Sequence, residues 1–159
     1  MSKTEPEYPA NGWTVNAKPN GELNSNGQTY PYLFWEGKGL GVYPDYHDRG
    51  FIVAQSDLVS AIRSQLAKQG LNSKEIADFM DFWQARLPQT PYVRLTWLNT
   101  SDMDKLAPLT VSPRPNSTLR IFLEFEGLQN PIALKPQTFY KASRDGFTLV
   151  EWGGLLIGK

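Results

Sequence analysis

Two glutamates of this 159-residue chain stand beside tryptophans in a pattern that could support acid–base chemistry. Glu36 directly follows Trp35, and Glu151 directly precedes Trp152. Each lies towards the end of a segment that alternates as a β-strand does. Two carboxylates in one aromatic-lined cleft are the apparatus of glycoside hydrolysis, in which one acts as an acid and the other as a base or nucleophile. Glu36 and Glu151 are therefore the candidate catalytic residues.

A carboxylate at a strand end also has a structural interpretation. It can pair with an arginine or accept hydrogen bonds from backbone N–H groups. The available partners are Arg49, Arg94, Arg120 and Arg144. Ion pairs of this kind shift pKa values without any catalysis. The sequence leaves open whether Glu36 and Glu151 are catalytic or structural.

The segment Tyr43-Pro-Asp-Tyr-His-Asp48 contains the single histidine of the chain. Asp45, His47 and Asp48 are the candidate metal ligands, with calcium as an alternative to zinc because it takes oxygen ligands. One imidazole without any cysteine supplies too few of the nitrogen and sulfur ligands that zinc prefers, so we expect no metal. His47 could also act as the base of a serine triad, but the chain has no Gly-x-Ser-x-Gly motif to place the nucleophile.

Aromatic side chains in the same segment could form a binding surface. Large aromatics usually lie in cores, and this is the interpretation we favour for those of residues 29–37. Tyr43 and Tyr46 lie in a loop, and exposed aromatic clusters mark binding sites. Tyr43, Tyr46 and His47 are therefore the candidate ligand-binding residues, with a protein or a glycan as the ligand.

The remaining motifs and the composition exclude several classes of protein. Three glycines from Gly37 to Gly41 follow a predicted strand, but residues 42–44 continue without a helix whose N-terminus could meet a phosphate. We therefore expect no cofactor. Sixteen basic and sixteen acidic residues cancel, so the electrostatic footprint of a nucleic-acid-binding protein is missing. The chain has no cysteine, and no apolar run approaches the roughly 20 residues of a membrane span.

Two helices are predicted in the middle of the chain. The first extends from the N-cap Ser56 to the stop signal Gly70. The second begins at Asn72, which forms a capping box with Glu75, and ends at Pro88. Its surface carries acids and aromatics rather than basic residues, so we do not interpret this helix pair as a DNA reader.

Strands are predicted on both sides of these helices. The predicted strand segments are 13–18, 22–23, 29–37, 51–54, 92–98, 118–126, 132–134 and 147–152. We expect 29–37 and 147–152 to lie in the core sheet, and 99–117 to be mostly loop because it contains three prolines. The fold class is α+β, with a mainly antiparallel β-sheet packed against a central two-helix hairpin. Residues 1–11 are expected to be a loose N-terminal segment and 12–159 a single domain.

Several segments taken together resemble a known group of proteins. They are Tyr30-Pro-Tyr-Leu-Phe-Trp-Glu-Gly37, Gly50-Phe-Ile-Val53, Phe82-Trp83, Arg86-Leu-Pro88 and Gly146-Phe-Thr-Leu-Val-Glu-Trp-Gly-Gly154. Their order resembles that in an uncharacterised family of bacterial proteins, often exported, without an established activity. The resemblance implies an extracellular or cell-envelope setting, whereas the polar N-terminus without a leader favours the cytoplasm.

We expect a non-enzymatic binding or interaction module whose ligand contacts the 37–50 loop and its aromatics. This expectation rests on the motifs that are missing: a nucleophile elbow, a cofactor fingerprint, a metal cluster and a basic face. One alternative is a small glycan-acting hydrolase that uses Glu36 and Glu151. Another is a purely structural domain of a larger assembly. The sequence predicts no oligomeric state.

Overall fold

The computed structural model describes residues 1–40 and 43–157. Its Cα positions divide the chain into two compact units, Met1–Leu40 and Gly41–Lys159. The predicted division at residue 11 is not tested by this grouping and stays a prediction. Among the described residues, no helix has the length and apolar character that crossing a membrane would need.

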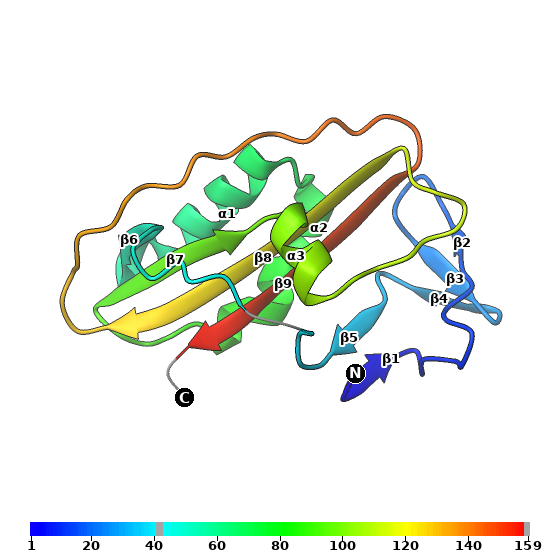
Figure 1. Ribbon diagram of the computed structural model, residues 1–159, viewed down its shortest axis with the longest axis horizontal. Helices are drawn as coiled ribbons and strands as arrows, with labels where there is room; N and C mark the ends of the chain where they lie inside the picture. Colours follow the sequence, from blue (N-terminus) through cyan, green and yellow to red (C-terminus); the bar gives the residue numbers. More distant parts are fainter. Residues whose placement is uncertain (41–42, 158–159) are drawn as a thin grey trace. The chain divides into compact units, whose positions relative to one another are not determined.

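The first unit consists of five short strands. They are β1 (Lys3–Glu5), β2 (Asn16–Ala17), β3 (Leu23–Ser25), β4 (Gln28–Tyr30) and β5 (Phe34–Glu36). β1 pairs with β5, and β2, β3 and β4 form a separate antiparallel sheet (Figure 1). Asn26 and Gly27 form the turn between β3 and β4, with φ values of 51° and 81°. Both positions of such a hairpin turn require positive φ, which explains the Asn-Gly pair.

The prediction of one strand over 29–37 in the core sheet is wrong. The segment is divided between β4 and β5, which belong to two different small sheets of the first unit. Pro31 lies between them, and proline cannot donate a ladder hydrogen bond. Pro31 therefore separates two short strands where the aromatic alternation predicted one.

The second unit contains a four-stranded sheet and three helices. The strands are β6 (Phe51–Ala54), β7 (Tyr92–Leu98), β8 (Ser117–Leu128) and β9 (Thr148–Ile157), in that spatial order. The helices are α1 (Leu58–Gln69), α2 (Ser73–Trp83) and α3 (Thr100–Leu106), with 3₁₀ turns η1 (Gln55–Asp57) and η2 (Gln84–Arg86). β6, β7 and β8 pair antiparallel, whereas β8 and β9 pair parallel. The predicted α+β class is confirmed, with one mixed sheet.

The start of α2 at Asn72 and the end of α1 at Gly70 lie where local signals predict them, whereas the predicted N-cap Ser56 lies within η1 and α2 ends at Trp83, before Pro88. The Asn72 side chain accepts a hydrogen bond from the Glu75 backbone N–H at 2.9 Å, and the Glu75 carboxylate accepts one from the Asn72 N–H at 2.8 Å. Gly70 ends α1 with a φ of 107°. α1 itself begins at Leu58, because residues 55–57 form the turn η1 first.

α1 and α2 cover one face of the four-stranded sheet (Figure 1). The alternate residues of β7 and β8 that point to these helices are fully buried: Val93, Leu95, Trp97, Leu119, Ile121, Leu123 and Phe125. Opposite them lie Leu58, Ile62, Leu66, Phe79 and Met80 of the two helices. This cluster is the hydrophobic core of the second unit.

α3 lies against the opposite face of the sheet (Figure 1). Its Met103 and Leu106 pack with Leu98 of β7 and Phe122 of β8. The prediction that 99–117 is mostly loop missed this helix. Asn99 and Asp102 form a capping box that starts it, and a helix of only two turns has too few apolar repeats to be recognised by periodicity.

The parallel pair β8 and β9 is joined by a long crossover, residues 129–147. Parallel strands need such a connection, and here it runs as extended chain past the helices (Figure 1). The strand predicted at 132–134 is absent from these described residues, where only Lys135 bridges to Arg49. Phe139 and Ala142 pack against the core cluster, so the crossover contributes burial rather than a strand.

Side chains approach the backbone of β9 closely at Gly153 and Gly154. A Cβ on Gly154 would lie 2.9 Å from the Trp83 ring, and one on Gly153 would lie 2.5 Å from the Phe122 ring. Real Cβ atoms do not approach this closely. Aromatic rings thus cover both faces of β9 at this point, which only glycine permits.

Candidate functional site

The sheet face opposite the helix pair carries a row of polar side chains. Arg120, Glu124 and Glu126 point to this face, as the alternation of β8 predicts. This face is not exposed to solvent, however, because Arg120 is only 1% exposed and Glu124 only 8% exposed. Their side chains are covered because α3 and the segment 43–50 cross over this face of the sheet.

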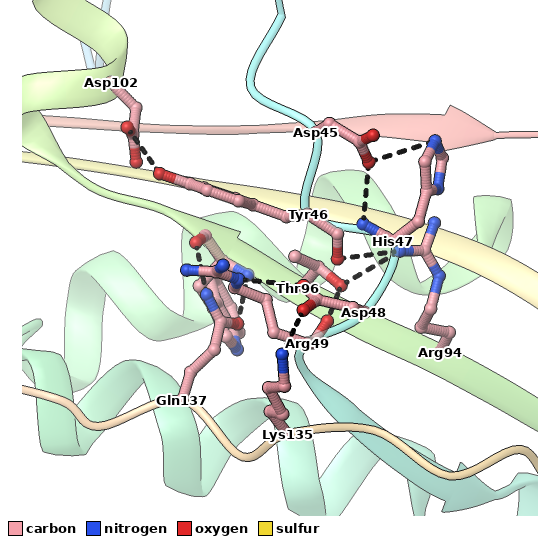
Figure 2. A network of polar contacts seen from close by, with 11 residues as sticks. Asp45, Tyr46, His47, Asp48, Arg49, Arg94, Thr96, Asp102, Lys135 and Gln137 are labelled. Carbon is pink, nitrogen blue, oxygen red and sulfur yellow. Dashed lines mark hydrogen bonds and ion pairs between the residues drawn. The ribbon is translucent and has the colours of Figure 1, made fainter.

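The segment 43–50 is fixed to β7 by hydrogen bonds to its backbone (Figure 2). Thr96 donates its hydroxyl to the carbonyl oxygen of Arg49 at 2.9 Å. Arg94 donates through Nη1 to the carbonyl oxygen of Tyr46 at 3.4 Å. Arg94 is 1% exposed and Thr96 is fully buried. Two buried side chains therefore bind a loop that has little regular structure of its own.

Tyr46 is a second anchor of this loop. Its hydroxyl donates to the Asp102 carboxylate of α3 at 2.8 Å, and the Arg49 guanidinium lies 4.8 Å from its ring centroid. Burial, followed by the hydrogen bond to Asp102, raises the pKa of Tyr46 above its ordinary value. Tyr46 was predicted as an exposed ligand-binding residue. The structure places it half-buried, with its hydroxyl and one ring face engaged.

Residues 48–50 tie the loop to the crossover segment 129–147. Lys135 donates through Nζ to the Asp48 carboxylate at 2.7 Å and through its backbone N–H to the Asp48 carbonyl at 2.9 Å. The Gly50 N–H donates to the Lys135 carbonyl at 2.9 Å. The Lys135 and Arg49 hydrogen bonds lower the pKa of Asp48. The loop is thus fixed on two sides, by β7 and by the crossover.

Tyr43 and Asp45 precede Tyr46, the first anchored residue, and His47 lies between the anchored residues Tyr46 and Asp48; all three side chains are exposed. Tyr43 is 45% exposed, and the side chains of His47 and Asp45 are 71% and 83% exposed. Asp45 accepts from the His47 backbone N–H at 3.2 Å, and its carboxylate lies 3.8 Å from His47 Nε2 (Figure 2). His47, one of the predicted ligand-binding residues, is therefore presented on the anchored part of the loop, and Tyr43, another, lies three positions before that part begins.

The predicted metal ligands Asp45, His47 and Asp48 do not form a ligand set. The Asp48 carboxylate is engaged by Lys135 and Arg49. Across residues 1–40 and 43–157, no three His, Cys, Asp or Glu side chains lie close enough together to hold a metal ion.

Arg94 and Glu124 form the buried part of the site, and the sequence reasoning did not single them out as functional. Arg94 donates through Nε to Glu126 at 3.0 Å, and its Nη2 lies 4.0 Å from Glu124 without a hydrogen bond. Burial raises the pKa of Glu124, although Arg94 opposes the shift. In the sequence, Arg94 and Glu124 stand at polar positions of two alternating strand segments. This pattern does not show that other parts of the chain cover that face of the sheet and bury both side chains.

The two candidate catalytic glutamates belong to different units. Glu151 lies on β9 and accepts from Arg120 Nε at 2.5 Å. Arg120 also donates to Asp104 at 2.8 Å and to the Ala107 carbonyl at 2.7 Å. Burial alone would lower the pKa of Arg120. The carboxylates of Glu151 and Asp104 more than offset burial, so the pKa of Arg120 is raised. Glu36 lies on β5 of the first unit and is exposed. Glu151 thus has the arginine partner that the structural interpretation requires.

Comparisons of the chain with protein-family models, curated proteins and solved structures found no match. The resemblance to an exported bacterial family stays a prediction.

Proposed function

We propose that the protein is a non-enzymatic binding module that recognises its ligand through the loop 43–49, with Tyr43 and His47 as the contact residues. The observation that carries the proposal is the contrast between the anchored backbone of residues 46–50 and the exposed side chains on and beside it. Buried Arg94 and Thr96 hold the loop backbone, while the side chains of Tyr43 and His47 remain in solvent.

This contrast favours binding because ordering a loop is costly. Fixing the backbone of each residue costs about 1–2 kcal/mol of conformational entropy. In this protein the loop backbone is already ordered on folding, because hydrogen bonds from β7, α3 and the crossover hold it. A ligand would then meet a preorganised surface, and preorganisation raises affinity. Irregular loops held by a rigid scaffold are common places for binding residues.

The polar groups of this region also favour binding over catalysis. Tyr46, Asp48 and Arg49 are engaged as anchors. Glu151, the glutamate of this unit proposed for glycan hydrolysis, is hydrogen-bonded to Arg120. The hydrolase hypothesis and the cell-envelope setting gain no specific support from these contacts and stay predictions.

The test uses the full chain, a random 12-residue peptide library on phage, and a glycan array. Tyr43→Ala and His47→Ala remove exposed side chains from the loop, so both variants should fold as the wild type does. Tyr140→Ala is the matched control, because Tyr140 is 85% exposed on the crossover. We expect probes selected by the wild type to lose about tenfold or more in affinity for the two loop variants, at least about 1.4 kcal/mol.

The control variant should bind the selected probes as the wild type does. Equal binding by wild type, Tyr43→Ala and His47→Ala would contradict the assignment to the loop. Failure of both libraries to enrich any probe would contradict a binding function of this loop for peptides and glycans.

A further inference from the structure

The first unit contains a pocket that is independent of the loop 43–49. Its volume is about 580 Å³, and it is lined by residues 6–10 on one side and by Ser25, Asn26, Gln28 and Tyr30 of the β3–β4 hairpin on the other. Small-molecule sites have volumes of roughly 300–1,000 Å³. The pocket is therefore large enough for a ligand rather than for a few water molecules.

The wall formed by residues 6–10 is held in place by Trp13. Its indole N–H donates to the carbonyl oxygens of Pro6 at 3.1 Å and Glu7 at 3.2 Å. The Tyr8 ring packs edge to face with the Trp13 ring, with centroids 4.8 Å apart. The Tyr8 backbone N–H donates to the Thr4 hydroxyl at 3.0 Å. Tyr8 is 45% exposed and yet fixed in orientation.

The opposite wall is also ordered. The Ser25 hydroxyl donates to the Thr14 carbonyl at 3.0 Å and is buried. Tyr30 donates its hydroxyl to Gln28 Oε1 at 2.6 Å, which orients the Gln28 amide. A side-chain amide offers two N–H donors as well as an oxygen acceptor. The hairpin thus presents an oriented aromatic ring together with amide groups.

The charges of the residues that line this pocket limit which ligands it can bind. The described lining residues include one carboxylate, Glu7, and no lysine, arginine or histidine. Phosphate and carboxylate ligands need cationic partners or clustered N–H donors. An anionic ligand would instead meet the Glu7 carboxylate. The lining therefore disfavours an anionic ligand, whereas a neutral ligand meets no like charge there.

Two neutral ligand classes use aromatic and amide groups together: saccharides and proline-rich peptides. Peptide grooves of the second kind combine aromatic rings with donors to the peptide carbonyls. One such donor beside this pocket, the Trp13 N–H, is engaged by the carbonyl oxygens of Pro6 and Glu7. Saccharide hydroxyls both donate and accept, which suits the Gln28 amide and the Glu7 carboxylate. The C–H face of a sugar ring suits the negative face of a tyrosine ring.

We propose that this pocket of the first unit binds a neutral saccharide, with Tyr8 as the stacking residue and Gln28 and Glu7 as hydrogen-bonding residues. The proposal does not rest on the function assigned to the loop 43–49. The residues involved are different, so either proposal can fail while the other holds.

The test is a titration of the full ¹⁵N-labelled chain with maltose, cellobiose and N,N′-diacetylchitobiose, followed by NMR. We expect at least one disaccharide to shift the Trp13 indole signal and the backbone signals of residues 6–10 and 25–28 in a saturable manner. Tyr8→Ala should weaken that binding about tenfold or more, at least about 1.4 kcal/mol. Gln28→Ala, an exposed position, should weaken it too and serves as the second variant if Tyr8→Ala disturbs the fold.

Tyr140→Ala on the second unit is the control and should bind as the wild type does. Decaproline is the competing probe. Saturable shifts of the same signals with decaproline and none with the disaccharides would overturn the proposal in favour of a peptide groove. Absence of saturable shifts with all three disaccharides would overturn it as well, and so would shifts confined to signals outside the first unit.

Discussion

Tyr46 donates its hydroxyl to the carboxylate of Asp102, 56 positions later in the chain, at a distance of 2.8 Å. Asp102 also caps α3, where it accepts from the Asn99 N–H at 3.1 Å. One carboxylate therefore links the loop 43–50 to the helix on the same face of the sheet. The order of that loop depends on a side chain that the sequence places in a different region.

Replacing Tyr46 by phenylalanine should destabilise the fold without removing the ring. The variant leaves the Asp102 carboxylate, which is 8% exposed, with one hydrogen bond fewer. We expect the free energy of unfolding to fall by about 1.5 kcal/mol, as for other hydrogen bonds to charged groups. Urea unfolding followed by circular dichroism measures this. Tyr140→Phe, at an exposed position, should change it by less than roughly 0.5 kcal/mol; equal effects of both variants would argue against the anchor.

Glu151→Gln and Glu36→Gln separate the structural from the catalytic interpretation of the two glutamates. Glu151 accepts from buried Arg120 at 2.5 Å, so its neutralisation should cost about 2 kcal/mol or more of unfolding free energy. Glu36 is exposed, and its replacement should cost less than roughly 0.5 kcal/mol. The measurement is the urea midpoint of each variant. An unchanged or raised midpoint for Glu151→Gln is what a functional carboxylate would give, and it would revive the hydrolase hypothesis.

Features set by neighbouring residues were predictable from the sequence. The capping box of Asn72 and Glu75, the Gly70 helix end and the Asn26-Gly27 turn each depend on side chains a few positions apart. The alternation of β7 and β8 likewise identified the core face correctly, because strand side chains alternate by geometry alone.

Features set by distant parts of the chain were not predictable. Arg120 and Glu124 alternate as surface residues do, and only the cover by α3 and the 43–50 loop buries them. The aromatic segment 29–37 suggested a core strand, but Pro31 and the pairing of β5 with β1 placed it elsewhere. The sequence singled out the loop residues Tyr43, Tyr46 and His47, which stay a prediction, while the loop's anchors Arg94, Thr96 and Asp102 were missed because each reaches the loop across more than 40 positions.

Gly50 lies directly against the backbone of β7, and alanine should not fit there. Its φ is 132°, and an added Cβ would overlap the Leu95 carbonyl oxygen and lie 2.7 Å from the Thr96 hydroxyl. Backbone strain and steric overlap together should lower the free energy of unfolding by about 3 kcal/mol. Gly21→Ala is the matched control, because Gly21 has a φ of 88° but no neighbour within 4 Å. Urea unfolding should show a loss of only about 1 kcal/mol in the free energy of unfolding for Gly21→Ala. An equal loss for the alanine variants of Gly21 and Gly50 would show that backbone strain alone accounts for both losses.

Glu124→Gln tests the pH dependence that follows from burial of this carboxyl group. Burial raises its pKa in the folded protein above 4.5, the ordinary value; the nearby charges of Arg94 and His47 oppose the shift, and those of Glu126 and Asp45 add to it. Because the folded state holds this proton more tightly than the unfolded chain does, its stabilising effect is complete below pH 4.5 and is lost as the pH rises through the folded pKa. Glutamine cannot ionise and imitates the protonated form.

The wild type should therefore lose unfolding free energy relative to Glu124→Gln as the pH is raised from 4 towards neutrality. Paired urea titrations of the two proteins at several pH values measure this difference, and the other titrating groups contribute nearly equally to both. A difference that moves in the opposite direction would mean that Arg94 governs the carboxylate. The pair would then be a stabilising ion pair at neutral pH rather than a buried group whose ionisation costs stability.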